Sequence, residues 1–300
     1  MKRRHGVNGE DGNAAPAPWR LLLRLIARLP QGAISRSTGR LARISIPSPL
    51  RAAVLGLFAR GAGIDLAEIE RPLTSYQTLD AFFVRRLRDG ARSWPDDPAA
   101  ITSPVDGIVG PSGPITAGRM LQAKGRPYSA ADILGDHDAA RPFDGGDFLT
   151  LYLSPRHYHR VHSPARGRIE SACHVPGALM PVNPPAMARI EELLPRNERL
   201  ICNLATDSGR IAIIAVGAFN VGRITAEFDA TLVTNRRGAV PVERAYDPGF
   251  AVGRGDEIMA FHLGSTVVML FERGSIRLAG DLATGREIRL GQPIAMPLGA

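Results

Sequence analysis

The chain has 300 residues, of which 44% are hydrophobic and 22% are charged, so it can bury a sizeable core and is not intrinsically disordered as a whole. We expect one large domain with a smaller appendage. Two cysteines, Cys173 and Cys202, are too few for a disulfide scaffold. We therefore expect both to be reduced core residues of a cytosolic protein.

Positive charge is concentrated at the start of the chain. Residues 1–60 contain eleven Lys and Arg residues against two acidic ones, Glu10 and Asp11, whereas the remainder is close to neutral. A nucleic-acid-binding module is one alternative, and it would bind tightly with a steep salt dependence. Because the remainder has neither a basic excess nor an aromatic platform, we expect no nucleic-acid partner.

A basic amphipathic helix is predicted over residues 19–29, after a polar tail at 1–18 that we expect to be disordered. Arg20, Arg24 and Arg28 lie on one stripe of this helix, opposite apolar side chains. It is too short and too charged to span a bilayer. Packing on the protein's own core is the alternative, but an anionic membrane surface suits the pattern better. We expect a peripheral membrane protein on the cytoplasmic face.

Two further helical patterns cover residues 50–58, after Pro47-Ser-Pro49, and residues 76–87. We assign residues 19–94 to a helical membrane-associating region. From residue 95 onward, short apolar segments alternate with Gly and Pro, which predicts a β-rich catalytic domain over 95–300. The expected fold class is α+β, with N-terminal amphipathic helices followed by a predominantly antiparallel β domain.

The most strand-like run is residues 266–271, and Gly264 and Ser265 stand directly before it. Glycine can adopt backbone angles that leave its carbonyl open to the neighbouring hydroxyl, although a Gly-Ser pair alone is ordinary turn chemistry. Other strands are predicted at residues 149–153, 173–177, 199–205, 211–219, 224–228 and 230–233.

Three histidines, His157, His159 and His162, fall within six residues. On an extended chain the first two share a face and could chelate a metal, but standard metal-ligand spacings are missing from the sequence. Arg156 and Arg160 would also repel a cation. We therefore expect no metal and favour acid–base chemistry, since imidazole titrates near neutral pH.

Asp106 lies in a Pro-Val-Asp-Gly segment that, alone, is good turn chemistry. In combination, Ser-Pro-Val-Asp106-Gly, Leu-Ser-Pro-Arg-His-Tyr-His159-Arg-Val-His162 and Phe-His-Leu-Gly264-Ser265-Thr resemble the phosphatidylserine decarboxylase family. His157 departs from the pattern, because the family usually carries Asp there, so it inherits no role. Residues 1–70 share only the general character of the family's N-terminal region and contain no matching motif. Further matching segments are 81–87, 122–125, 128–129 and 197–199.

The resemblance implies a proenzyme that cuts itself between Gly264 and Ser265, giving a β chain of residues 1–264 and an α chain of residues 265–300. Asp106 would orient His162, which takes the proton of Ser265 so that its oxygen attacks the carbonyl of Gly264. Elimination from the resulting ester would leave dehydroalanine at residue 265. This becomes a covalent pyruvoyl group, the only cofactor that we expect.

The implied reaction is the decarboxylation of phosphatidylserine to phosphatidylethanolamine in phospholipid biosynthesis, by a pyruvoyl-dependent carboxy-lyase. The substrate amine would form a Schiff base at residue 265, and the carbonyl would act as the electron sink that side chains lack. His159 would return the proton, with His162 as the alternative donor. The resemblance also suggests a homodimer of cleaved protomers.

A serine hydrolase is the alternative function for the same residues. It would use Asp106, His162 and Ser265 on an external ester. Such an enzyme would keep one 300-residue chain, so the intact mass distinguishes the two functions.

Overall fold

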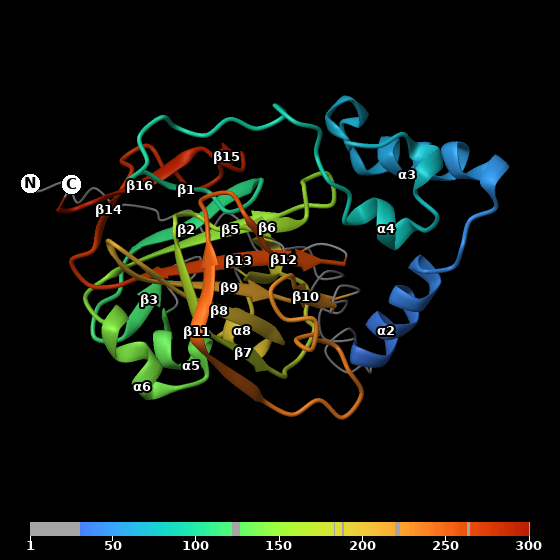
Figure 1. Cartoon of the computed structure of the whole chain (residues 1–300). Helices are drawn as coiled ribbons and strands as arrows, with labels where there is room; N and C mark the ends of the chain where they lie inside the picture. Colours follow the sequence, from blue (N-terminus) through green and yellow to red (C-terminus); the bar gives the residue numbers. More distant parts are fainter. Residues whose placement is uncertain are drawn as a thin grey trace, which may run out of the picture.

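The computed structural model describes residues 31–121, 127–182, 184–187, 189–219, 223–262 and 265–299 (Figure 1). Several predicted features lie outside the described residues: the tail 1–18, the basic helix 19–29, the segment 122–125 and Gly264.

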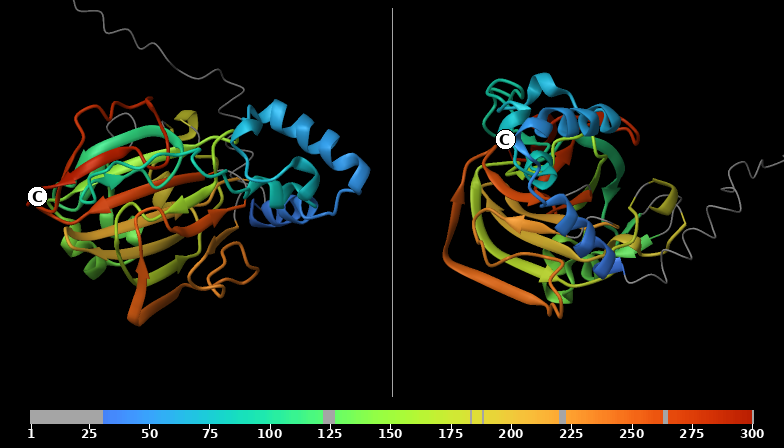
Figure 2. Two further views of the ribbon diagram at one scale, coloured as in Figure 1. Left: turned by 45° about the horizontal axis from the view of Figure 1, so that its top comes forward. Right: turned by 90° about the vertical axis from the view of Figure 1, so that its right-hand side faces the viewer.

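Three helices form the N-terminal part of the described chain: α2 (Gln31–Ala42), α3 (Arg51–Ala62) and α4 (Leu79–Phe83). The 3₁₀ turns η1 (Ser48–Leu50), η2 (Leu66–Glu68) and η3 (Leu73–Ser75) connect them. α3 contains the predicted helix 50–58 apart from its first residue, and it ends at Gly63, whose φ of 73° suits glycine. Figures 1 and 2 show these helices together at one end of the strands. Among the described residues, no helix has both the length and the apolar character needed to cross a membrane.

α4 is shorter than the helical pattern at 76–87 predicts. It begins after Thr78, whose hydroxyl accepts a hydrogen bond from the amide of Ala81 at 3.0 Å. Beyond Val84 the chain becomes extended, because the amide of Arg88 donates to the carbonyl of Glu68 at 2.9 Å. Pairing with the preceding segment therefore replaces the last turns of the expected helix.

The largest sheet among the described residues has eight strands, and each neighbouring pair is antiparallel. This arrangement confirms the α+β fold with a mostly antiparallel β region. Cys173 and Cys202 lie on adjacent strands as free thiols. In spatial order the strands are β11 (Val242–Val252), β7 (Gly167–Val175), β8 (Arg199–Thr206), β9 (Gly209–Val216), β13 (Ser265–Phe271), β5 (Asp147–Leu153), β2 (Gly107–Pro114) and β15 (Glu287–Ile288).

Smaller sheets surround the large one. The prediction of a strand at 230–233 is wrong. Asp229 accepts hydrogen bonds from the amide and the hydroxyl of Thr231, and these bonds turn the chain there. Of the predicted residues, only Val233 forms a β-bridge, to Thr225. The small sheets are β1 (Ile101–Thr102), β16 (Pro293–Pro297) and β14 (Ile276–Leu278); β10 (Ile224–Ala226), β12 (Glu257–Phe261) and β6 (Arg160–His162); and β3 (Arg119–Leu121) with β4 (Pro127–Ser129).

β13 separates two hydrophobic cores, as its uncharged sequence predicts. Val267, Met269 and Phe271 face a core shared with β1, β6, β10, β12 and β16. Val268 and Leu270 face a second core on the opposite side. Short helices cover that side: α5 (Ala130–Leu134), α6 (His137–Ala140), α7 (Pro184–Met187) and α8 (Leu193–Arg196), with the 3₁₀ turn η5 (Arg141–Phe143).

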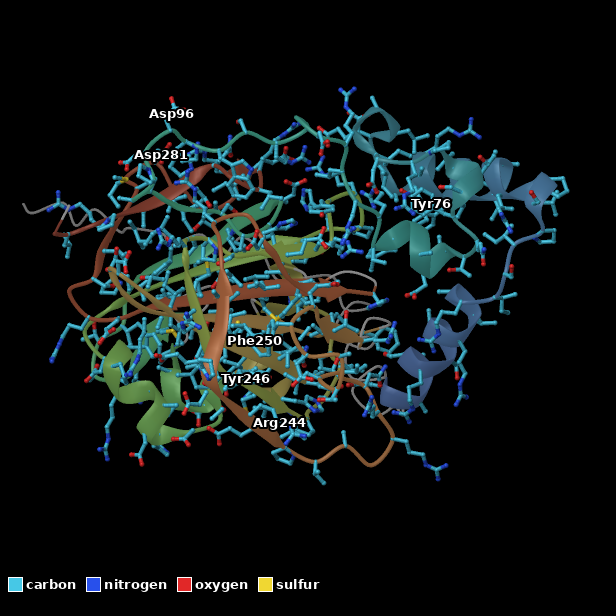
Figure 3. All side chains as sticks on the ribbon, in the orientation of Figure 1. Tyr76, Asp96, Arg244, Tyr246, Phe250 and Asp281 are labelled. Carbon is cyan, nitrogen blue, oxygen red and sulfur yellow. The ribbon has the colours of Figure 1, made fainter. Side chains whose placement is uncertain are left out.

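The edge strand β11 is held by side chains as well as by its pairing with β7. Arg244, Tyr246 and Phe250 lie along it (Figure 3), and the rings of Tyr246 and Phe250 are 4.7 Å apart. The hydroxyl of Tyr246 donates to a carboxylate oxygen of Asp229 at 2.9 Å. This contact fastens the edge of the sheet to the loop after β10.

Candidate functional site

Two chain connections meet at the end of the large sheet. The connection from β12 to β13 contains residues 262–264, and the connection from β5 to β6 contains the histidine segment. Ser265 pairs with Leu153 in the register of β13 and β5, and the amide of Phe261 donates to the carbonyl of His159 at 2.9 Å. The fold therefore brings the histidine motif beside Ser265, the first residue of β13, whereas residue 264 lies outside the described residues.

His159 is completely buried, and its ring lies 4.1 Å from that of Phe83, between centroids. Its Nδ1 donates to the carbonyl of His157 at 2.8 Å, while Nε2 has no hydrogen-bond partner among the described residues. Burial, assisted by the nearby guanidinium of Arg85, holds the pKa of His159 well below its ordinary value. The ring is therefore neutral at physiological pH, with an unshared lone pair on Nε2.

His162 is oriented by a backbone carbonyl and a phenol. Its Nδ1 donates to the carbonyl of Gly255 at 2.7 Å, and its Nε2 accepts from the hydroxyl of Tyr158 at 3.1 Å. Burial is the main cause of a lowered pKa for His162. His162 lies on β6, whereas His159 precedes that strand, and the two rings have different hydrogen-bond partners. The two rings therefore occupy separate environments.

Asp106 lies near His162, but the expected hydrogen bond between them is not formed in the structure. Both carboxylate oxygens of Asp106 instead accept from Arg92, at 2.9 Å from Nε and 2.5 Å from Nη2. The amide of Leu290 also donates to Asp106 at 2.9 Å. The amide of His162 bonds the carbonyl of Pro104 at 2.9 Å, so the two elements are adjacent. The joint role of Asp106, His162 and Ser265 stays a prediction.

A cavity of about 280 Å³ lies beside Asp106 and Arg92, but neither His159 nor His162 is among the residues that line it. Arg85, Arg92, Asp106, His157 and Tyr158 are among the residues that line it. Burial is the main cause that lowers the pKa of His157 to about 4, and Arg156 adds to it. No cluster of three or more His, Cys, Asp or Glu side chains suited to a metal ion occurs in the part of the chain that the structure describes.

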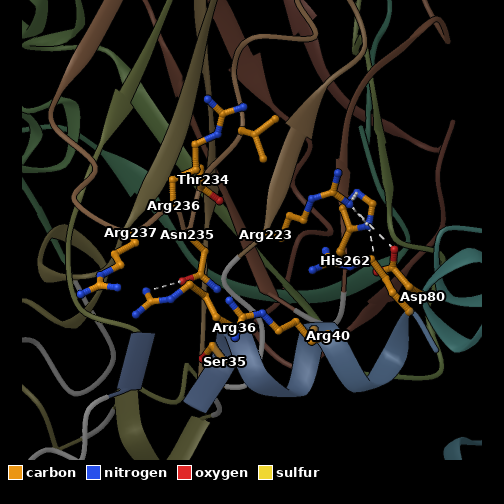
Figure 4. A pocket seen from close by; sticks show the side chains of 13 residues that line it. Ser35, Arg36, Arg40, Asp80, Arg223, Thr234, Asn235, Arg236, Arg237 and His262 are labelled. Atoms are coloured by element: carbon orange, nitrogen blue, oxygen red, sulfur yellow. Dashed lines mark hydrogen bonds and ion pairs between the residues drawn. The ribbon is translucent and has the colours of Figure 1, made fainter. Parts of the chain in front are cut away.

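An Asp–His pair next to the Gly264-Ser265 step escaped prediction from the sequence. Nδ1 of His262 donates to Asp80 at 2.9 Å, and Nη1 of Arg223 lies 3.2 Å from Nε2 of the same ring (Figure 4). Burial alone would raise the pKa of Asp80, but the hydrogen bond from His262 and the nearby arginines outweigh it and lower that pKa. The partners are 182 positions apart in the sequence and so left no local signal, although Asp80 directly precedes the matching segment 81–87.

The comparisons with known proteins agree with the motifs. The family model described as phosphatidylserine decarboxylase matches residues 79–296. A phosphatidylserine decarboxylase proenzyme from Anaeromyxobacter sp. (strain K) is 44% identical over 92% of this chain and 98% of its own length. Proenzymes of the same description from Myxococcus xanthus and Brevibacillus brevis are 38% and 37% identical, over 91% and 92% of this chain and 97% and 98% of their own lengths.

Removing Arg92 should destabilise the folded chain strongly. Its side chain and that of Asp106 are each only 8% exposed, so Arg92→Gln leaves a buried carboxylate without its cation. We expect the free energy of unfolding to fall by about 3–5 kcal/mol. Urea denaturation in an uncut Ser265→Ala background measures this loss on a single chain. Arg71→Gln is the control, since its ion pair with Glu70 is exposed and should contribute at most about 1 kcal/mol. Equal effects of the two substitutions would contradict the assignment.

Proposed function

The chain belongs to the phosphatidylserine decarboxylase family, and from this premise we propose that it converts phosphatidylserine to phosphatidylethanolamine and carbon dioxide with a pyruvoyl group made from Ser265. The observation that carries the proposal is the meeting of the histidine segment with the start of β13, through the pairing of Ser265 with Leu153 and of Phe261 with His159.

Self-cleavage would begin when the oxygen of Ser265 attacks the carbonyl carbon of Gly264. An ester forms as the peptide nitrogen leaves that carbon. Elimination would then remove the proton from the α-carbon of residue 265 and break the bond between its β-carbon and the ester oxygen, leaving a carboxyl group on Gly264 and dehydroalanine at residue 265. Water replaces the nitrogen of dehydroalanine, ammonia departs, and the pyruvoyl group results.

The described residues at this end of the sheet fit a pyruvoyl group. Nε2 of His159 and Oγ1 of Thr266 are buried and have no hydrogen-bond partner among the described residues, so both can serve a group that the sequence alone does not contain. The pyruvoyl carbonyl would supply a sink for the electron pair that stays on the substrate when carbon dioxide leaves.

His159 is the proposed proton donor to the α-carbon of the product. Because its Nδ1 is held by the carbonyl of His157, Nε2 is the atom that can gain and then deliver the proton. The substrate brings negative charge to a ring that is neutral when the site is empty, and an anion beside an imidazole favours its protonated form. The apolar face of Phe83 keeps water from the ring.

Membrane attachment is part of the proposal. Exposed apolar side chains gather on α2, α3 and the segment between them, and such a group of residues is typical of a membrane-contacting surface. Together with the helix predicted at 19–29, this face would rest on an anionic cytoplasmic surface. A homodimer of cleaved protomers also stays within the proposal. The exposed apolar residues are Leu41, Ile44, Leu50, Val54 and Leu57.

Mass spectrometry under denaturing conditions tests self-cleavage. We expect the wild-type protein to separate into fragments 1–264 and 265–300, the smaller one beginning with a pyruvoyl group and therefore blocked to Edman degradation. Ser265→Ala should keep one chain and lose decarboxylation. A wild-type protein that is uncut yet hydrolyses an external ester would support the serine hydrolase instead.

The two histidines should divide the reaction between them. His162→Ala should impair cleavage, because the ring that is held by Gly255 and Tyr158 is the proposed base. His159→Ala should still be cut, but its decarboxylation should fall by about 10²- to 10⁴-fold, the range for a missing general acid. Cleavage followed by intact mass, and release of carbon dioxide, measure the two steps separately. The reverse pattern would exchange their roles.

The exposed face of α3 should contribute to vesicle binding. Leu57→Asp replaces a side chain that is 68% exposed, and we expect binding to phosphatidylserine vesicles to weaken about tenfold, because about 1.5 kcal/mol of apolar burial is lost. Val240→Asp is the matched control, with 65% exposure on the loop before β11. Vesicle co-sedimentation measures both variants, and self-cleavage should persist in each. Equal binding of vesicles by the two variants would contradict the assignment of α3 to the membrane-contacting surface.

A further inference from the structure

A second cavity, of about 330 Å³, lies between α2, the loop around Asn235 and His262 (Figure 4). Its volume is in the range of small-molecule sites. The described residues that line it include six arginines but a single carboxylate, that of Asp80. The arginines are Arg36, Arg40, Arg43, Arg223, Arg236 and Arg237.

Among the described residues, the positive charge of this cavity is largely unmatched. Asp80 already accepts from His262 and lies 3.8 Å from Arg223, while the guanidinium of Arg36 donates to the amide oxygen of Asn235 at 3.5 Å. The other arginines of the cavity form no ion pair with any described residue. Burial lowers the pKa of Arg223, and the charges of Arg43 and Arg236 lower it further. An anion in the cavity would relieve this repulsion.

The cavity lies close to the proposed reactive residue. His262 forms part of its wall and stands three residues before Ser265. Since a chain spans at most about 3.3–3.6 Å per residue, the Cα atoms of these two residues are within roughly 11 Å of each other. His262 therefore places one wall of the cavity in the neighbourhood of residue 265.

We propose that this cavity binds the phosphate diester of the phospholipid substrate, through Arg36 and Arg40 of α2, while the substrate amine is held at residue 265. The proposal rests on the proposed decarboxylation. Guanidinium groups match phosphate oxygens with paired, charge-assisted hydrogen bonds. A site that is complementary to the phosphate would fix the head group for the reaction at its other end.

The substrate carboxylate is the less suitable occupant of the arginine cavity. It loses its charge as carbon dioxide leaves, so arginines around it would stabilise the ground state more than the transition state. The phosphate keeps its charge throughout the reaction. Binding it stabilises both states equally, which predicts an effect on KM rather than on kcat.

Kinetics on dihexanoyl phosphatidylserine, kept monomeric and in a phosphate-free buffer, test this site without a membrane. Arg36→Ala and Arg40→Ala should each raise KM by about 10- to 100-fold, the loss expected for hydrogen bonds to a charged group, and should change kcat by less than about threefold. Arg36→Lys should restore part of the affinity. Arg277→Ala, an exposed arginine on β14, removes the same charge and should leave KM unchanged.

Inorganic phosphate distinguishes the sources of the anion. It should compete with the monomeric substrate in the wild-type protein, and its inhibition constant should rise in Arg36→Ala. If the variants lose activity only on vesicles that also contain phosphatidylglycerol, the cavity serves a neighbouring lipid and the substrate assignment is overturned. Unchanged KM in both α2 variants, or an equal change in Arg277→Ala, would also overturn it.

Failure of the phosphate site and failure of the proposed function give different results. Intact mass and turnover of the wild-type protein are measured first. If the wild-type chain neither cuts itself nor releases carbon dioxide, the function fails, and the phosphate assignment fails with it. If the wild-type protein is cut and active but the arginine variants keep its KM, the phosphate assignment alone fails.

Discussion

The pairing of β13 with both β5 and β9 is the constraint on which the site depends. Val267 to Phe271 are fully buried and face two different cores, so a slip of one residue would move each side chain into the wrong core. The register therefore fixes Ser265 opposite Leu153. Because the histidine segment follows Leu153 along the chain, the same register also positions that segment beside the start of β13.

Burial and charge then separate the functions of neighbouring groups. His159 lies against Phe83 with one nitrogen unpartnered, whereas both nitrogens of His162 have partners. Asp106 is held by Arg92, which also contacts Glu68 at 2.8 Å, in a network that ties the N-terminal helical part to the strands. The site is thus built on ion pairs between the two parts of the chain. This dependence suits an enzyme whose lipid substrate would arrive at the N-terminal helices.

Local patterns in the sequence predicted the parts of this architecture that local forces determine. The uncharged run 266–271 predicted a buried strand, and the apolar pattern at 50–58 predicted most of α3, because each signal depends on nearby residues alone. The contacts of Asp80 with His262 and of Arg92 with Asp106 could not be predicted. They join segments that are brought together only by tertiary packing. From the sequence alone, a charged residue in such a segment is equally compatible with a position on the solvent-exposed surface. The arginine-lined cavity could not be predicted for the same reason, since its arginines come from separate elements.

Self-cleavage at residue 265 would have to follow folding, because the site is assembled from segments more than a hundred residues apart. It would also leave the smaller chain in place. That chain supplies β13, β14, β15 and β16, and the five buried side chains at 267–271 contribute roughly 1.5–3 kcal/mol each by burial. Together these side chains contribute on the order of 10 kcal/mol. We expect this burial to outweigh the stabilisation lost when one peptide bond at the start of β13 is broken, because the pairing of β13 with β5 and β9 begins at residues 265 and 266. The strand that positions residue 265 would thus also retain it after the proposed cleavage.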